Sequence, residues 1–239
     1  MKHFNDVSPL TIRGVGVFFS LVVAAAGFVL LRQGDLGIFP KRLPGGFTKP
    51  IIAVELVQTA TDFEAIVGSG SEDRRRLWMI ASLWPDNFVT IPTYWLVLIV
   101  TAWLVVRSRL RAASSFGIAA AVCATAAALF DFMENRAMRS ALVAATGDLT
   151  QEMVNNIRQA SLCKWGLLSV SIGLLSSLFI ARKDWLTVVG ALYLVTALVG
   201  LLGLYHHPAL EWMVIPVALG FIGVALTFTL SPAKVLGEP

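Results

Sequence analysis

Residues 115–135 read SFGIAAAVCATAAALFDFMEN, a mostly apolar run that ends in two acidic side chains and an amide. A helix needs about 20 such residues to cross the hydrocarbon core of a bilayer. The many small side chains in this run let neighbouring helices approach closely. The stretch therefore predicts a transmembrane helix that carries Asp131, Glu134 and Asn135 to one face of the membrane.

Five further apolar runs predict the remaining spans. Hydrophobic residues make up 56% of the 239-residue chain and charged residues 14%, whereas soluble domains carry about 25% charge. We predict an all-α integral membrane protein: a single membrane domain over residues 1–239, with about six transmembrane helices and two short helices between spans one and two. The spans lie near residues 13–32, 88–106, 115–135, 160–181, 185–205 and 210–230.

The orientation follows from the basic residues of the short loops. Arg107, Arg109 and Arg111 follow the second span, and Arg182 and Lys183 follow the fourth. The positive-inside rule assigns such loops to the cytoplasm, which predicts a multi-pass protein of the cell membrane with both termini cytoplasmic. The extracytoplasmic loop at 33–87 is also basic and argues for the reverse, but long loops weigh less under the rule.

The loop at 33–87 begins with turn residues and becomes helical from about residue 51 to residue 67. Its polar side chains Glu55, Gln58, Thr59 and Asp62 recur at helical spacing and form one stripe. Two interpretations stay open. The stripe faces water on a helix that lies at the interface, or it turns toward the bundle as a lid or pocket wall.

A second loop helix, capped by Ser71, is predicted to start at the charged run Glu72–Arg76 and to run to Trp84. Pro85 is expected to end it, and Asp86 is expected to cap the next span through that span's free N–H groups.

Asp131, Glu134 and Asn135 share one helical face, because their spacing is i, i+3, i+4. A carboxylate in hydrocarbon costs about 2 to 3 kcal/mol unless it is paired or hydrated, so these groups need partners. Lys164 lies about one turn inside the next, antiparallel span and is predicted to pair with Asp131 or Glu134. One lysine leaves a carboxylate over, to be hydrated, protonated, or matched by Arg136, Arg139 or a cationic ligand.

Counting spans brings further polar residues to the same membrane side. The expected ligand-binding residues are Glu55, Asp62, Asp86, Asn87, Asp131, Glu134, Asn135 and Lys164; His206, His207 and Glu211 share that side, and the hydroxyl of Tyr94 is within reach. Among the eight expected ligand-binding residues, acidic side chains outnumber basic ones five to one. The site should therefore favour a proton, a cation or a hydroxyl-rich neutral molecule over an anion.

Three functions fit this constellation. It can line an extracytoplasmic-side acidic pocket that binds or transports a small polar or cationic solute, which is the function we predict. It can belong to a membrane-embedded enzyme acting on a lipid or prenyl substrate, with the carboxylates as general acid and base. It can also be a structural network in a subunit of a membrane complex.

The sequence lacks the usual markers of an enzyme: we find no Ser-His-Asp arrangement, no phosphate-binding glycine loop and no metal-ligand spacing, so no metal is predicted. Catalytic residues and a cofactor stay unidentified. The expected partner is the lipid bilayer, with a homo-oligomer or a membrane complex left open. Nucleic acid is not expected, because the basic residues lie at helix ends without interleaved aromatic side chains.

Overall fold

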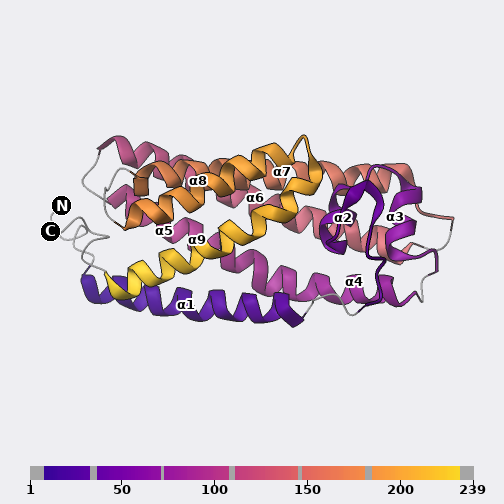
Figure 1. Ribbon diagram of the computed structural model, residues 1–239, viewed down its shortest axis with the longest axis horizontal. Coiled ribbons are helices and arrows are strands. Elements are labelled where there is room, and N and C mark those ends of the chain that lie inside the picture. The colour runs from indigo at the N-terminus through magenta and orange to yellow at the C-terminus, as the bar shows by residue number, and fades with distance from the viewer. Residues whose placement is uncertain are drawn as a thin grey trace.

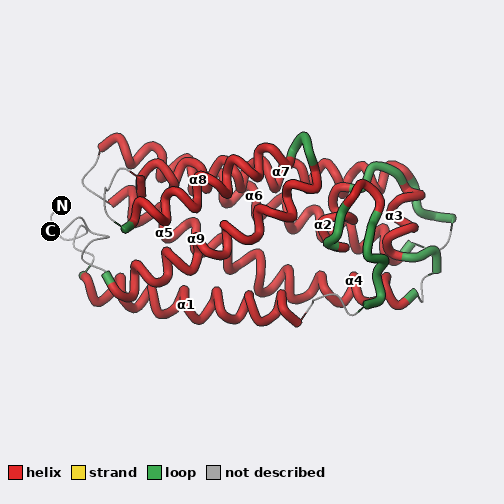
Figure 2. Tube along the Cα trace, in the orientation of Figure 1, coloured by secondary structure: helices red, strands yellow, loops and turns green. Residues whose placement is uncertain are grey.

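The computed structural model describes residues 8–32, 37–70, 73–107, 111–144, 147–180 and 185–231. In these ranges every regular element is a helix (Figure 2). The long helices lie side by side along the longest axis of the molecule (Figure 1). The first and the last long helices are antiparallel neighbours, since the ring of Phe19 packs against that of Phe228 with 5.7 Å between centroids.

Six long helices form the bundle, and four of them contain segments that are long and apolar enough to cross a membrane. Those segments are Ser114–Val143, Gln151–Ser177, Leu186–Gly203 and His207–Leu230. Helix α5 has only 17 residues, and the apolar described part of α1 is Leu10–Ala25. The bounds of the six helices are α1 (Pro9–Arg32), α5 (Ile91–Arg107), α6 (Arg111–Val143), α7 (Gln151–Ile180), α8 (Leu186–Gly203) and α9 (Leu210–Leu230).

Helices α6 and α7 are longer than the spans predicted for them. They contain 33 and 30 residues, or about 50 and 45 Å of helix, against a hydrocarbon thickness of about 30 Å. Both run on at the same end, where the chain turns from α6 into α7. The extensions are polar overall, but Met138, Leu142 and Val154 are buried there, so packing holds these turns beyond the apolar run.

Three short helices pack on this end of the bundle (Figure 1): α2 (Pro50–Leu56), α3 (Ala60–Val67) and α4 (Arg74–Pro85). The single helix predicted for residues 51–67 is wrong, because α2 and α3 are separate. The Thr59 side chain caps α3 by accepting from the N–H of Asp62. Gln151 of α7 accepts from the N–H of Ala60 and donates to the carbonyl of Gln58, so the break leaves these backbone groups satisfied.

The α-helical segment α4 ends at Pro85, as predicted, but the chain does not break there. Pro85 has helical dihedral angles (φ −62°, ψ −28°), and the chain continues through a π-helical turn, η2 (Asp86–Thr90), directly into α5. In that turn the N–H of Ile91 donates to the carbonyl of Asp86, five residues back. The chain is therefore helical without a break from Arg74 to Arg107, with one π turn between two α-helical segments.

Glycines bring α8 and α9 into close contact, as the small residues of these spans predict. A Cβ atom on Gly220 would overlap the ring of Tyr193, and one on Gly203 would overlap the side chain of Leu210. Both glycines are buried. Substitution there would therefore force the two helices apart.

Candidate functional site

The ammonium group of Lys164 lies at the centre of a buried polar network. Its Nζ atom is 2.8 Å from Oε2 of Glu134, 3.1 Å from Oε2 of Glu55 and 3.3 Å from Oδ1 of Asp131. All four residues are at most 6% exposed. The predicted pairing of Lys164 with Asp131 or Glu134 is confirmed, and the lysine contacts both.

Two aromatic residues complete the surroundings of the lysine. The Tyr94 hydroxyl of α5 donates to Oδ2 of Asp131 at 2.9 Å, so the two oxygens of that carboxylate serve different partners. The indole N–H of Trp165 donates to Oε2 of Glu55 at 2.9 Å, and its ring centroid lies 4.9 Å from the Lys164 Nζ atom. A cation over an indole face is stabilised by the negative face of the ring.

Asn135 extends the network toward η2. Its amide donates to Oδ2 of Asp86 at 2.7 Å and to Oδ1 of Asn87 at 3.1 Å. Asn87 in turn donates at 2.8 Å to the carbonyl of Leu83, which also accepts from the N–H of Asp86. The Asp86 side chain is thus engaged by Asn135, not by the span's N–H groups as predicted.

Burial raises the pKa of the Asp86 carboxyl, because the charged form loses hydration. The hydrogen bond from Asn135 and the positive charge of Lys164 act in the opposite direction, while the charge of Glu55 adds to the increase. Asp86 therefore holds its proton to a higher pH in the folded protein than in an unfolded chain.

We call these residues the Lys164 cluster; they come from α2, η2, α5, α6 and α7. Its members are Glu55, Asp86, Asn87, Tyr94, Asp131, Glu134, Asn135, Lys164 and Trp165. Three carboxylates contact one ammonium group, so two negative charges are unbalanced if all ionise. An unbalanced buried charge costs several kcal/mol, so protons or a cation must supply the difference.

Several residues expected near the cluster lie elsewhere. Asp62 accepts from the hydroxyl of Thr59 within its own helix and is only partly buried. Arg136 and Arg139 are exposed on α6 and contribute no ion pair to the cluster. The polar stripe predicted for residues 55–62 is thus divided, since Glu55 points into the bundle and Gln58 and Thr59 are exposed.

Glu211, at the start of α9, fixes the beginning of α2 instead of joining the cluster. Its carboxylate accepts from the N–H and hydroxyl of Thr48, both at 2.6 Å, and from the N–H of Lys49 at 2.7 Å. These N–H groups precede α2 and have no partner in that helix. Glu211 therefore positions α2, which in turn carries Glu55 to Lys164.

Arg76 fixes the other side of this end of the bundle. It is 1% exposed, and its guanidinium group donates to the carbonyls of Leu142, Ala144 and Gly68 at 2.8 to 3.2 Å. The first two carbonyls lie at the C-terminus of α6, where the helix dipole favours a positive charge. This role could not be predicted, because Arg76 stands in a run of three arginines that look alike in the sequence.

His207 joins the loop before α9 to α7. Its Nδ1 atom lies 3.1 Å from the carbonyl oxygen of Gly203, and its Nε2 atom lies 3.3 Å from a guanidinium nitrogen of Arg158. A carbonyl accepts and a guanidinium donates, so these contacts fit an imidazole that donates from Nδ1 and accepts at Nε2.

An apolar cavity of about 240 Å³ lies between α1 and the segment η2–α5. Its lining is Val22, Ala25, Phe88, Val89, Pro92, Thr93 and Leu96. No member of the Lys164 cluster lines this cavity, so it gives the carboxylates no opening to the lipid.

Comparison with known proteins identifies no relative of this chain. No protein-family model matches the chain, and no curated protein and no solved structure is significantly similar to it.

Proposed function

We propose that this chain is a polytopic membrane protein that binds a proton, or a small cation in its place, at the Lys164 cluster. The proposal has two parts. The first is that six helices cross the membrane, and the second is that the cluster is a binding site at the extracytoplasmic face.

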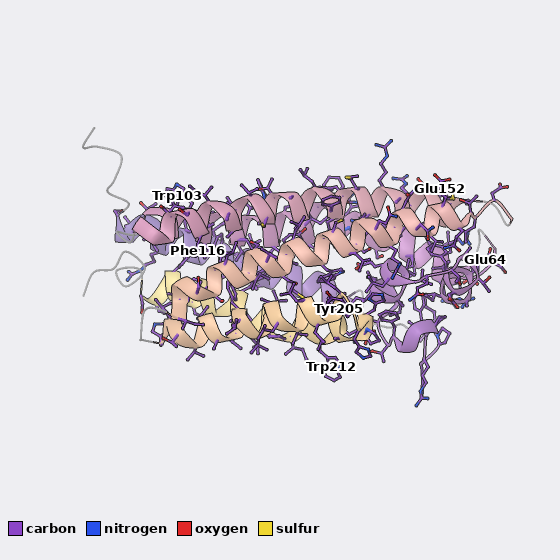
Figure 3. The ribbon with its side chains drawn as sticks, turned by 90° about the horizontal axis from the view of Figure 1, so that it is seen from above. Glu64, Trp103, Phe116, Glu152, Tyr205 and Trp212 are labelled. Carbon is purple, nitrogen blue, oxygen red and sulfur yellow. The ribbon has the colours of Figure 1, made fainter. Side chains whose placement is uncertain are left out.

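Exposed aromatic side chains support six spans. Trp103 and Phe116 lie toward one end of the bundle (Figure 3). Tyr205 and Trp212 lie together farther along the long axis, at a position that we call the second level (Figure 3). Helix α8 contains 18 residues, or about 27 Å of helix, close to the hydrocarbon thickness of about 30 Å, and the exposed Trp185 and Tyr205 flank its two ends. Aromatic residues of this kind gather at the two membrane interfaces.

Beyond the second level lie α2, α3 and the extended ends of α6 and α7, with Glu64 and Glu152 near the tip (Figure 3). We assign this end to the outside of the cell membrane and both termini to the cytoplasm, following the arginines between the second and third spans. The cluster then lies at the outer boundary of the hydrocarbon, where a proton or ion can arrive from water.

The observation that carries the binding proposal is the surplus of buried carboxylates around one lysine. Glu55, Asp131 and Glu134 lie within 3.3 Å of the Lys164 ammonium group, and Asp86 is linked through Asn135. A proton is the smallest ligand that neutralises a carboxylate without new space. Release and uptake of that proton would change how tightly α2 is held, because Glu55 belongs to α2.

Infrared spectroscopy tests this proposal directly, because a protonated carboxyl group has a carbonyl band distinct from that of a carboxylate. The purified protein should show that band at neutral pH and lose it on alkalinisation. The variants Glu55→Gln, Asp131→Asn and Glu134→Gln should each alter its intensity or its titration between about pH 5 and pH 8. The matched control is Glu152→Gln, an exposed carboxylate outside the cluster.

If all three variants titrate like the wild type, the cluster binds no exchangeable proton. A small cation is tested in the same variants by comparing thermal stability in sodium, potassium and choline salts at one ionic strength. Stabilisation by a small cation that is absent from Asp131→Asn and Glu134→Gln would assign the site to that cation.

A structural role is the second candidate, because the cluster joins α2, the segment η2–α5, α6 and α7. It predicts that neutral isosteres lower stability without changing proton uptake. The lipid-directed enzyme gains no support from the described residues, since the apolar cavity is separate from the carboxylates.

A further inference from the structure

The outward face of α6 carries a continuous apolar stripe. Ile118, Val122, Leu129 and Met133 are each between 57% and 63% exposed. With 100° between successive residues, these positions fall within about 40° of a single line along the helix. In a membrane this line is in contact with lipid chains.

Two arginines follow the stripe on α6. Arg136 lies seven residues beyond Leu129, close to two full turns, and so lies on the line of the stripe. Arg139 is rotated by about 60° from Arg136 and follows the exposed Phe132 by seven residues, at the edge of the same lipid-facing surface. Both side chains are exposed, and within the described ranges neither guanidinium group has an ion-pair partner. The surface thus changes from apolar to strongly basic within one turn.

The height of this change corresponds to a lipid headgroup. Arg136 is 20 residues from Phe116, so it lies about 30 Å from the level of Phe116 at the opposite interface. An arginine at that height can extend its charged end to the phosphate layer while its stem stays on the apolar surface. A guanidinium group also matches a phosphate geometrically, since it donates two parallel hydrogen bonds.

We infer that Arg136 and Arg139 bind the phosphate of an anionic phospholipid whose acyl chains lie along the α6 stripe. We assign the ligand as a lipid headgroup and not a free phosphate ion, because the apolar stripe continues directly into the arginines. This inference rests on the membrane placement proposed above and is independent of proton binding at the Lys164 cluster. An anionic phospholipid should bind more tightly than a zwitterionic one. Each basic residue near an anionic membrane surface strengthens binding to that surface about fivefold.

Native mass spectrometry of the detergent-solubilised protein tests the inference, with phosphatidylglycerol and phosphatidylcholine added in equal amounts. The wild type should retain more phosphatidylglycerol. The variant Arg136→Gln/Arg139→Gln should lose that preference, about 25-fold if each arginine contributes fivefold. The control is Arg74→Gln, which removes an exposed arginine of α4 and should leave the preference unchanged.

Equal retention of phosphatidylglycerol by the wild type and the double variant would overturn the inference. So would displacement of the lipid by inorganic phosphate at low concentration, since that result assigns the arginines to a free anion. The inference is supported if Arg136→Lys keeps part of the phosphatidylglycerol preference that Arg136→Gln/Arg139→Gln loses. Lysine keeps the positive charge but does not form the paired hydrogen bonds. Recovery of the protein from cells without detergent would contradict the membrane placement itself.

Discussion

At the scale of single residues, Lys164 is the group on which the site depends. It compensates one of three neighbouring carboxylates and lies over the ring of Trp165, and its ammonium group is shielded from solvent. Removing it would leave acidic groups buried together with no cation among them.

Lys164→Met should destabilise the protein by about 3 to 5 kcal/mol, because it strands buried carboxylates. Thermal or denaturant-induced unfolding in detergent measures the loss. Neutralising one carboxylate as well should restore part of the lost stability. Each double variant of Lys164→Met with Asp131→Asn, Glu134→Gln or Glu55→Gln should therefore lose less stability than the two single variants lose together. Strict additivity in all three pairs would contradict the network.

Asp86 should make stability depend on pH. Its pKa is raised in the folded protein, so the folded state binds the proton more tightly than the unfolded state. That contribution is complete below the ordinary pKa of aspartate and is lost as the pH rises through the raised value. Asp86→Asn does not titrate, so its stability relative to the wild type should increase across this window.

Unfolding midpoints of the two proteins measured from about pH 4 to pH 8 test the sign. A constant difference over the whole range would mean that Asp86 has its ordinary pKa.

The sequence was sufficient to pair Lys164 with Asp131 or Glu134, because two antiparallel neighbours and the helical rise fix their depths, but not to show that the lysine contacts both. It also placed Tyr94 within reach of the acidic groups. It did not separate Glu55 from Asp62, since that choice depends on the break at residues 57–59, which is stabilised by Gln151 from a distant helix. Trp165 is not among the predicted site residues, although its neighbour in the chain is the central lysine.

At the scale of elements, the segment α2–α3 is held on the bundle by polar contacts from two helices. Glu211 fixes the start of α2, and Gln151 fixes the break between α2 and α3. Neither contact has a local sequence signal, because each partner is at least 90 residues away. Helix ends in this region were therefore the least predictable part of the fold.

Glu211→Ala should loosen α2 without unfolding the bundle. It removes three hydrogen bonds to Thr48 and Lys49, and their partial exposure limits the loss to about 1 kcal/mol. Hydrogen exchange of residues 48–56 should become faster, while exchange in α8 stays as it was. Glu152→Ala, an exposed acidic residue of α7, should leave both regions unaffected.

Unchanged exchange at residues 48–56 in Glu211→Ala would mean that apolar packing alone holds α2. In that case Ala53, Val54 and Leu56, all of which are fully buried, carry the attachment.

At the scale of the whole molecule, composition and the apolar runs predict the helical architecture well. The predicted run at 210–230 coincides with α9, and the other long helices differ mainly in length. The extensions of α6 and α7 could not be predicted from hydropathy, since they are stabilised by packing against α2 and α4 and not by lipid.

The proposed orientation predicts the accessibility of the two loops that flank α6. Single cysteines replacing Ser108 and Asp148 are placed in a background without Cys123 and Cys163, both of which are free thiols. Asp148 is preferable to Gly147, whose φ of +93° disfavours any side chain. An impermeant thiol reagent added to intact cells should label position 148 and not position 108. The opposite pattern would reverse the orientation.

The π turn between α4 and α5 has a further consequence, for how this chain can change length. A turn closed by an i→i+5 bond holds one residue more than a regular turn, so removing one residue from Asp86–Thr90 leaves an α-helix whose two halves keep their rotational phase. Deleting the exposed Phe88 should therefore be tolerated, whereas deleting the buried Val97 rotates half of α5 by about 100° and should abolish folding. We therefore expect this helix to tolerate a one-residue deletion at the turn beside the Lys164 cluster and not in the rest of α5.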